Sequence, residues 1–228
     1  MRTIVYIDGF NLYFGCLKNT SYKWLDLYKL FKEYLLDDTT TCLYIKYFTA
    51  LIRSQYSDDS QAPFRQKKYL EALTAYSPPD SFEIVYGHFP RAQKKYMRRA
   101  QPSEHYPENS QDRYTVKVLT FEEKQSDVNI AVHIINDAWL NKFDQAVLCS
   151  NDTDLISILK SLKEHHSTKR IGVVCPIRNK PDPNRHPSQG LIEHAHWRRL
   201  WISPEHLKNA QLPAQIPNTN IRKPDKWC

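Results

Sequence analysis

The 228-residue sequence predicts a doubly wound α/β sandwich with a mostly parallel sheet. Segments with the pattern of strands alternate with segments with the pattern of helices, as in parallel α/β folds. Several strand segments are continuously apolar, which indicates strands buried on both faces of such a sheet. A composition of 41% hydrophobic, 12% aromatic and 25% charged residues excludes a disordered chain and a membrane protein.

The first half of the chain supplies three strand segments and two helical ones. In order, we predict a strand over residues 3–7, a helix over 22–36, a strand over 42–52, a helix over 61–76 and a strand over 82–89. Large apolar side chains recur at helical spacing in the first helix, and Pro78 and Pro79 end the second. This half therefore has the alternation that a parallel sheet requires.

The second half continues the pattern after a polar interruption. Residues 90–113 are rich in Pro, Gln, Arg and Lys, and a polar stretch of this length predicts a functional or mobile loop. Residues 114–121 have the pattern of a strand in a hairpin or at an edge. Beyond them we predict a helix over 126–140, a strand over 145–149, a helix over 152–165, a strand over 170–175, a polar loop over 176–189 and a last strand over 197–202. The core face of the helix over 126–140 is expected to consist of Val128, Ala131, Val132, Ile135 and Trp139.

The sequence shows no internal repeat and no linker of the kind that separates domains. We therefore expect one domain over residues 1–202, followed by a C-terminal extension over 203–228 that is partly disordered. Whether the chain forms a homodimer stays open at this point.

The start of the chain and its cysteines predict a cytoplasmic protein without membrane contact. The N-terminal residues lack the long apolar region of a signal peptide, and no apolar run approaches the length of a membrane span. The five cysteines form an odd set without C-x-x-C spacing, which suggests neither a disulfide framework nor a cysteine zinc site.

The net charge and the glycine spacing restrict the ways in which the protein can bind an anion. The 32 Lys and Arg residues outnumber the 25 Asp and Glu residues, and the net charge of +7 favours an anionic partner. The five glycines are too widely spaced for the G-x-G-x-x-G fingerprint or the G-x-x-x-x-G-K-[ST] loop. If the protein handles phosphates, it uses groups other than a glycine loop.

Aspartates stand where a doubly wound fold gathers its ligands, at the carboxyl ends of strands. Asp8 follows the first strand, Asp152 and Asp154 follow the strand over 145–149, and Asp127 opens the helix after the long loop. Each one alone is better explained as a helix cap or first-turn residue. Together, however, four carboxylates at one edge repel each other unless a cation neutralises them, and their hard oxygen atoms suit Mg²⁺ or Mn²⁺.

Three segments carry a resemblance to a known family: IVYIDGFNLYF at the start, EEKQSDVNIAVHII in the centre and VLCSNDTDLISILKSL later. In this order and context they resemble the NYN domain, a branch of the PIN-like nuclease superfamily. The resemblance implies a Rossmann-like, PIN-like three-layer α/β/α sandwich and a metal-dependent ribonuclease. One departure is visible, because many members have glycine in the segment where this chain has Gln125 and Ser126.

The resemblance also implies roles for individual residues. The metal-binding acids are Asp8, Asp127, Asp152 and Asp154, with Asn11 beside the first and Ser150 and Thr153 as polar neighbours. The expected reaction is in-line attack of an activated water on an RNA phosphodiester. Asn11 is expected to orient the water or the phosphate, and Lys124 to steady the developing charge, although Lys124 is as easily explained as a solvated lysine.

A basic stretch over residues 88–99 is a candidate for contact with single-stranded RNA. Cations that track phosphates and rings that stack on bases are the combination that such strands require. The candidate residues are Arg91, Lys94, Lys95, Tyr96, Arg98 and Arg99. A solvated loop is the alternative. A second basic stretch contains Lys169, Arg170, Arg178, Lys180 and Arg185.

Two other functions remain open. The chain could be a non-cleaving module that binds RNA or protein, although binding alone does not need all four acids. It also resembles bacterial NYN-like proteins that carry the name 6-hydroxy-3-succinoylpyridine hydroxylase. A flavin- or nicotinamide-dependent hydroxylase would want a dinucleotide site, and the glycine spacing supplies none.

Overall fold

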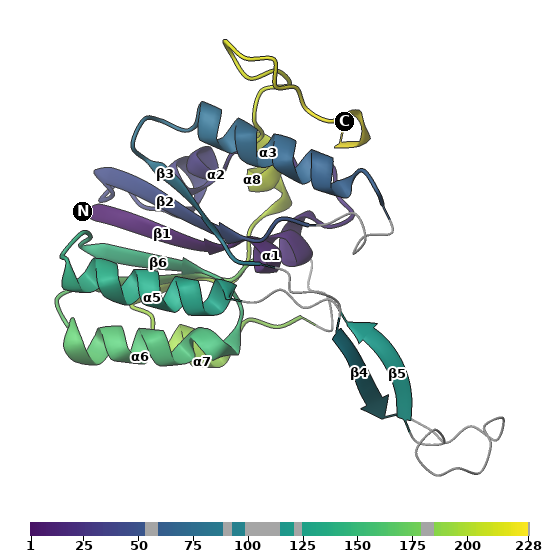
Figure 1. Ribbon diagram of the computed structural model, residues 1–228. Helices are drawn as coiled ribbons and strands as arrows, with labels where there is room; N and C mark the ends of the chain where they lie inside the picture. The colour runs from purple at the N-terminus through teal and green to yellow at the C-terminus, as the bar shows by residue number, and fades with distance from the viewer. Residues whose placement is uncertain (53–58, 89–92, 99–114, 121–124, 179–184, 228) are drawn as a thin grey trace.

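The computed structural model describes residues 1–52, 59–88, 93–98, 115–120, 125–178 and 185–227, and for residues 93–98 and 115–120 the backbone alone. Its centre is a six-stranded parallel sheet in the order β3-β2-β1-β6-β7-β8 (Figure 1). The strands are β1 (Arg2–Asp8), β2 (Cys42–Thr49), β3 (Phe82–Tyr86), β6 (Gln145–Cys149), β7 (Arg170–Val174) and β8 (Trp197–Arg199). The chain winds outward from β1 in one direction and from β6 in the other, so the predicted doubly wound sandwich is confirmed.

Helices cover both faces of this sheet (Figure 1). One face carries α1 (Gly9–Leu12), η1 (Tyr13–Leu17), α2 (Leu27–Lys29), η2 (Leu30–Leu35), α3 (Ala62–Tyr76) and α8 (Pro204–Asn209). The other carries α5 (Ser126–Trp139), η4 (Thr153–Leu155), α6 (Ile156–His165) and α7 (Gln189–Glu193). Side chains of β1 alternate between the two cores: Val5 and Ile7 pack on the first face, and Ile4 and Tyr6 on the second.

The register of the strands aligns their carboxyl ends. Asp8 at the end of β1 pairs with Phe48 of β2, and Ile7 pairs with Cys149 at the end of β6. Cys149 in turn pairs with Val174 at the end of β7. The segments that follow these strands therefore meet at one edge of the sheet, and the switch point of the winding lies between β1 and β6.

A two-stranded hairpin projects from the sandwich (Figure 1). Strand β4 (Gln93–Arg98) pairs antiparallel with β5 (Thr115–Thr120). Residues 93–98 belong to the stretch predicted as a loop, so the structure differs from that prediction. The polar composition of β4 does not predict a strand, because the β-branched residues that favour strands lie in its partner β5.

Helix α5 forms where it was predicted, but its predicted core face is wrong for most residues. Val128, Val132 and Trp139 are 63%, 58% and 70% exposed. The buried stripe is instead Ile130, Ile134 and Ala138, while Ala131 and Ile135 pack at its margin. Two apolar stripes fit the helical period on this helix, and the buried one also contains Ser126 and Asp137, which made it look polar in the sequence.

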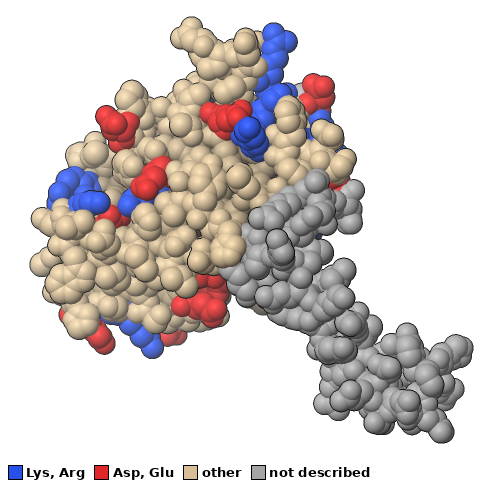
Figure 2. All heavy atoms as spheres, viewed as in Figure 1, with Lys and Arg blue, Asp and Glu red and all other residues tan. Residues whose placement is uncertain are grey.

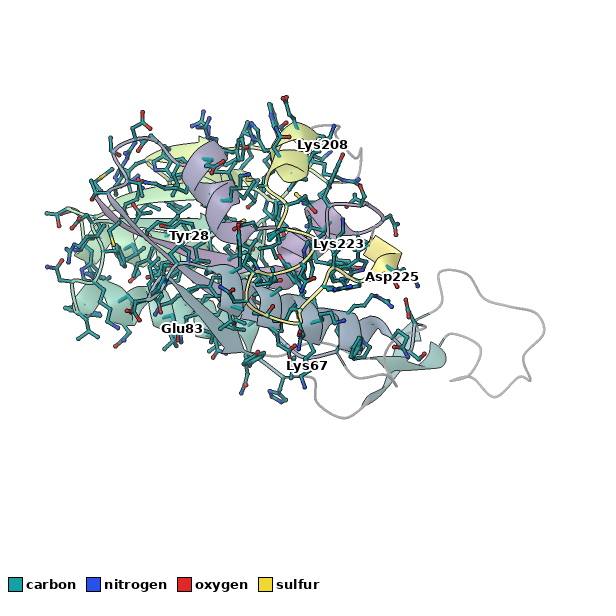
Figure 3. All side chains as sticks on the ribbon, turned by 90° about the horizontal axis from the view of Figure 1, so that it is seen from above. Tyr28, Lys67, Glu83, Lys208, Lys223 and Asp225 are labelled. Carbon is teal, nitrogen blue, oxygen red and sulfur yellow. The ribbon has the colours of Figure 1, made fainter. Side chains whose placement is uncertain are left out.

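The C-terminal segment differs from the partly disordered extension that was expected. Leu207, Leu212 and Ile216 are buried in the first core. Trp227 in η5 (Asp225–Trp227) lies 6.3 Å from the ring of Trp24. Figure 3 shows Lys223 and Asp225 on the segment that runs beside α3.

Three further features complete the description. The helix predicted over residues 22–36 begins only at Leu27, because Asp26 accepts the N–H of Lys29 at 2.9 Å and caps α2. The cysteines in the described part of the chain, Cys16, Cys42, Cys149 and Cys175, are free thiols. None of the described helices has the length and apolar character needed to cross a bilayer.

Candidate functional site

Asp8 is the centre of the candidate site, at the carboxyl end of β1. Its side chain is 5% exposed, and Oδ1 accepts the backbone N–H of Asn11 at 2.9 Å, which caps α1. Oδ2 accepts the hydroxyl of Ser150 at 3.1 Å. Asp8 is thus the helix cap that its residue type favours, and it is also tied to the strand on the other side of the switch point.

The segment after β6 brings the backbone of a second aspartate, Asp152, to the same hydroxyl. Ser150 is fully buried, and its Oγ accepts the backbone N–H of Asp152 at 3.1 Å while it donates to Asp8. Asp152 Oδ1 accepts the N–H of Asp154 at 3.0 Å and caps η4. Asp154 and Thr153 are exposed on that turn. One hydroxyl therefore connects Asp8 with the backbone of Asp152.

Asn11 is held by a residue that was not among the predicted site residues. Its Oδ1 accepts from Nη2 of Arg185 at 2.9 Å and from the N–H of Asn151 at 3.3 Å. Asn151 in turn accepts the N–H of Ser188 at 2.7 Å and donates to the carbonyl of His186 at 2.9 Å. The segment that begins at Arg185 is thereby fastened to the acidic edge. Its membership of the second basic stretch was the available signal in the sequence.

Asp127 lies in the first turn of α5, and α5 contacts η4. The residue before this helix, Gln125, has a φ of 80°, in the left-handed region that favours glycine. Gln125 and Ser126 form the segment in which the resemblance to the NYN domain leads us to expect glycine. Gln125 keeps the conformation while its Oε1 lies 3.0 Å from Nδ1 of His88.

The four acids do not form a single ligand group. Among the described residues, no three His, Cys, Asp or Glu side chains lie close enough to hold one metal ion. The donor chemistry nevertheless fits Mg²⁺ or Mn²⁺, because Mg²⁺ commonly takes only one or two carboxylates and keeps several waters. Asp8 and Asp152 are the pair that the Ser150 hydroxyl connects.

Gly9 allows the chain to turn beside Asp8. A Cβ at this position would lie 2.7 Å from the carbonyl oxygen of Phe48 and 2.7 Å from the hydroxyl of Tyr47. Any larger residue would therefore displace β2. Burial, and secondarily the charge of Asp8, raise the pKa of Tyr47, so this hydroxyl stays protonated next to the site.

The predicted RNA-binding residues are only partly placed. The backbone positions of Lys94, Lys95, Tyr96 and Arg98 lie on β4. Arg91, Arg99 and Lys124 lie outside the described residues. On the face drawn in Figure 2, acidic and basic side chains of the described part of the chain are interspersed rather than gathered in one basic patch.

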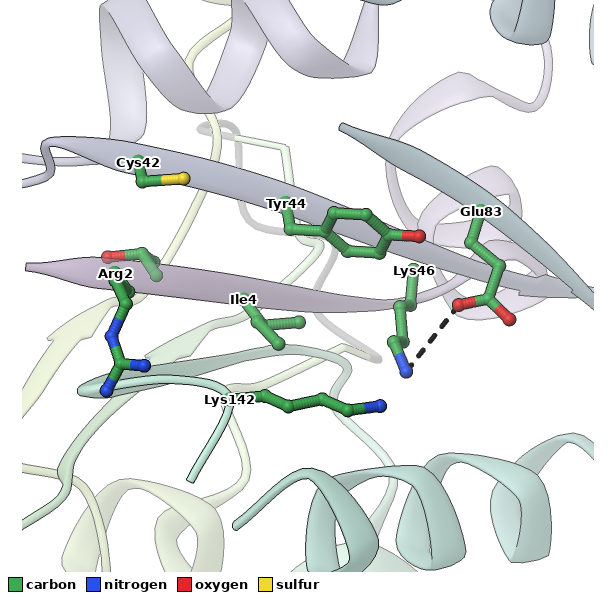
Figure 4. A pocket seen from close by; sticks show the side chains of 8 residues that line it. Arg2, Ile4, Cys42, Tyr44, Lys46, Glu83 and Lys142 are labelled. Carbon is green, nitrogen blue, oxygen red and sulfur yellow. Dashed lines mark ion pairs between the residues drawn. The ribbon is translucent and has the colours of Figure 1, made fainter. Parts of the chain in front are cut away.

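A cavity of about 390 Å³ lies at the opposite edge of the sheet, near the starts of β1 and β2 (Figure 4). Lys46 extends into it and is paired with Glu83 at 3.5 Å and with the buried Asp137 at 2.7 Å. Asp137 also pairs with Lys142 at 3.2 Å and accepts the hydroxyl of Tyr6 at 3.0 Å. These charges neutralise one another, so the cavity is a structural feature away from the acidic edge.

Comparisons with known proteins agree with this description. The sequence profile of the NYN domain matches residues 2–195. The 6-hydroxy-3-succinoylpyridine 3-monooxygenase HspA of Pseudomonas putida is 33% identical over 242 aligned residues, which cover all of this chain and 75% of that protein. The crystal structure of a protein of unknown function from Vibrio parahaemolyticus superposes with a TM-score of 0.51 at 19% identity, over 90% of this chain and 94% of the other. The last similarity concerns the fold alone.

Proposed function

Since the chain belongs to the NYN domain family, whose fold is nuclease-like, we propose that it is a metal-dependent ribonuclease that hydrolyses phosphodiester bonds of single-stranded RNA. The observation that supports this most is the link from Asp8 through Ser150 to Asp152 across the switch point of the sheet. Parallel α/β sheets bind their ligands at this place. We expect the activity in the cytoplasm.

The proposal assigns metal-binding and positioning roles to the residues of the acidic edge. Asp8 and Asp152 would hold Mg²⁺ or Mn²⁺, and Asp127 and Asp154 would be further acids near the same edge. A bound ion of this type lowers the pKa of a water and stabilises the leaving oxygen of a phosphodiester. Ser150 fixes the orientation of Asp8 and the position of Asp152 through its two hydrogen bonds. These two bonds would keep the two acids in one arrangement when a substrate binds.

Arg185 supplies the positive charge that an approaching phosphate requires. Its guanidinium bonds Asn11, one hydrogen bond away from Asp8. Guanidinium groups bind phosphate oxygens through paired N–H donors, so Arg185 and the Asn11 amide are suited to hold the RNA backbone beside the carboxylates. The basic residues Lys94, Lys95, Tyr96 and Arg98 of β4, with Arg91 and Arg99, would follow the strand farther out.

Cleavage of a labelled single-stranded RNA by the full chain tests the proposal. We expect cleavage in Mn²⁺ or Mg²⁺, none in excess chelator, and a loss of more than about 100-fold for Asp152→Asn, which removes a ligand charge but keeps a capping side chain. The exposed Asp38 offers a matched control, since Asp38→Asn removes the same charge away from the edge. Cleavage that persists in chelator or in Asp152→Asn contradicts the proposal. RNA binding without cleavage would identify a binding module instead.

A second candidate function is hydroxylation of an aromatic ring. It is favoured by the 33% identity to a 6-hydroxy-3-succinoylpyridine 3-monooxygenase over the whole length of this chain. Such a reaction needs a reductant and dioxygen, which a nicotinamide or flavin cofactor would couple. NADH oxidation that depends on 6-hydroxy-3-succinoylpyridine, together with an absence of RNA cleavage in Mn²⁺, would establish this function over the first.

A further inference from the structure

A cavity of about 380 Å³ lies beside the acidic edge, on the face of the sheet covered by α1, η1 and α3. Gly9, the residue after Asp8, lines this cavity. Tyr47 also lines it, and the Tyr47 hydroxyl lies against Gly9. The C-terminal η5 closes another side. The volume is within the range of small-molecule sites, which are typically about 300–1,000 Å³. The cavity is therefore adjacent to the candidate site and of a size to hold one small ligand.

Aromatic side chains form much of the wall. They are Phe10, Tyr13, Phe14, Tyr47, Tyr69 and Trp227. Trp227 meets Tyr69 edge-to-face with ring centres 6.0 Å apart, and Tyr13 meets Phe14 in the same way at 5.3 Å. Rings arranged at angles to one another leave faces and edges on which a further planar ring can pack. The apolar part of this cavity thus favours an aromatic ligand.

The charged part of the wall is cationic. Lys23, Arg65 and Lys226 line the cavity, and Asp59 is the acidic residue among the lining residues that the structure describes. Asp59 pairs with both Arg65 and Lys226. The described lining residues therefore carry three cations and one carboxylate, a net charge of +2. Burial lowers the pKa of Lys23, and the nearby charges of Arg65 and Lys226 lower it further.

Polar groups with fixed partners complete the site. Gln66 donates to the carbonyl of Ala50 at 2.9 Å and accepts the N–H of Ile52 at 2.8 Å, so its amide is occupied in holding the wall. Arg65 and Lys226 share the carboxylate of Asp59, and Lys23 is the lining cation for which the described residues show no ion pair. An anion bound there would reduce the repulsion among Lys23, Arg65 and Lys226.

We propose that this cavity binds a planar aromatic ring that carries an anionic group, with the ring among the aromatic side chains and the anion at Lys23 and Arg65. In the ribonuclease, a nucleotide of the RNA strand is such a group, and its phosphate would lie one step along the strand from the acidic edge. The identification with RNA rests on the proposed function. The binding chemistry does not, because it follows from the residues that line the cavity.

Equilibrium binding to the full chain, measured by calorimetry, tests the inference in the presence of chelator, so that no cleavage is needed. The probes are AMP, adenosine, ribose 5-phosphate and nicotinate. Adenosine lacks the charge and ribose 5-phosphate lacks the ring, so we expect each to bind at least about tenfold more weakly than AMP, a difference of roughly 1.4 kcal/mol. Saturation by AMP indicates a nucleotide site, and saturation by nicotinate alone indicates a site for a small aromatic carboxylate.

Variants show whether binding occurs in this cavity. Lys23→Gln and Lys226→Gln each remove one lining cation, and we expect each to weaken binding at least about fivefold, with thermal unfolding as the check on folding. Lys67→Gln is the matched control, because Lys67 is an exposed cation of α3 that does not line the cavity (Figure 3).

Binding of none of the probes at millimolar concentration, or equal effects of Lys23→Gln and Lys67→Gln, overturns the inference. AMP binding without RNA cleavage would leave the cavity assigned while the ribonuclease proposal fails. RNA cleavage without binding of any probe would overturn the inference about the cavity and leave the ribonuclease proposal standing.

Discussion

Ser150 is the residue on which the geometry of the acidic edge depends. Its buried hydroxyl donates to Asp8 and accepts from the backbone of Asp152, and each bond is 3.1 Å long. A residue in this position acts on two carboxylate-bearing residues without touching substrate. It is therefore a positioning residue in the proposed ribonuclease.

We predict that Ser150→Ala lowers RNA cleavage by about 10–100-fold, the usual cost of losing a group that orients a ligand. The free energy of unfolding should fall by about 1–3 kcal/mol, because the Asp8 carboxylate loses a buried donor. Denaturant unfolding and a cleavage assay at saturating Mn²⁺ measure the two effects. Ser188→Ala is the stability control, since the Ser188 hydroxyl is buried without a hydrogen-bond partner in the described structure. An equal loss of stability in both variants would contradict the account.

The buried charges around Lys46 predict how stability depends on pH. Burial, and then the charge of Lys46, lower the pKa of His133 from its ordinary 6.5. Burial alone would raise the pKa of Asp137, but Lys46, Lys142 and Tyr6 outweigh it, and its pKa is lowered from 3.8. In both cases the unfolded chain binds protons more readily than the folded chain, so stability falls as the pH falls.

The expected loss begins below about pH 6.5 through His133 and continues below about pH 4 through Asp137. Unfolding free energies measured from pH 8 to pH 3 should show both parts, and His133→Gln should remove the first part only. A stability that stays constant between pH 7 and pH 5 in the wild-type chain would show that His133 does not titrate as described.

Helix α5 shows how an element can be predicted correctly while its orientation is not. The period fits a helix over residues 126–140, but two apolar stripes share that period, and packing against β1 and β2 selects the one with Ile130 and Ile134. The selection depends on Asp137, whose charge is compensated by Lys46 from β2. Because that partner comes from another strand, the sequence of the helix alone does not reveal it.

Alanine substitution distinguishes the two stripes. Ile134→Ala should lower the free energy of unfolding by about 2–5 kcal/mol, because Ile134 is 1% exposed and its loss leaves a cavity. Val132→Ala should change it by no more than about 0.5 kcal/mol, because Val132 is 58% exposed. Urea unfolding of both variants is sufficient, and the reverse order would mean that the predicted face is the buried one.

At the scale of the whole molecule, the sequence predicts the sheet and most of the edge where the candidate site lies. Continuous apolar strands identify β1, β6 and β7, and the rule for doubly wound folds then places Asp8 and Asp152 at one edge. Arg185 is not predicted as a partner of Asn11, because that contact joins residues 174 positions apart and Arg185 belongs to no helix or strand. The aromatic cavity is also missed, since its wall combines α1, α3 and the C-terminal segment.

The C-terminal segment is part of the fold rather than an appendage, although the NYN match ends at residue 195. Leu207, Leu212 and Ile216 are buried, and Trp24 donates its indole N–H to the carbonyl of Pro213 at 2.8 Å. We predict that a chain ending at residue 202 unfolds at a clearly lower temperature, because it exposes this part of the first core. A chain ending at residue 222 keeps these residues and should lose less. Equal melting temperatures of the shortened and full chains would contradict this.

The central claim is that the edge around Asp8 is the site of RNA hydrolysis, and the rate of cleavage by Asp8→Asn tests it most directly. Asparagine keeps one acceptor oxygen, which can still cap α1, but its amide nitrogen cannot accept the Ser150 hydroxyl, and it removes the charge that would hold a cation. With labelled single-stranded RNA in Mn²⁺, we predict that the wild-type chain cleaves and that Asp8→Asn is slower by more than about 100-fold at a temperature where thermal unfolding shows that the variant is still folded. Cleavage by Asp8→Asn at the wild-type rate would contradict the account.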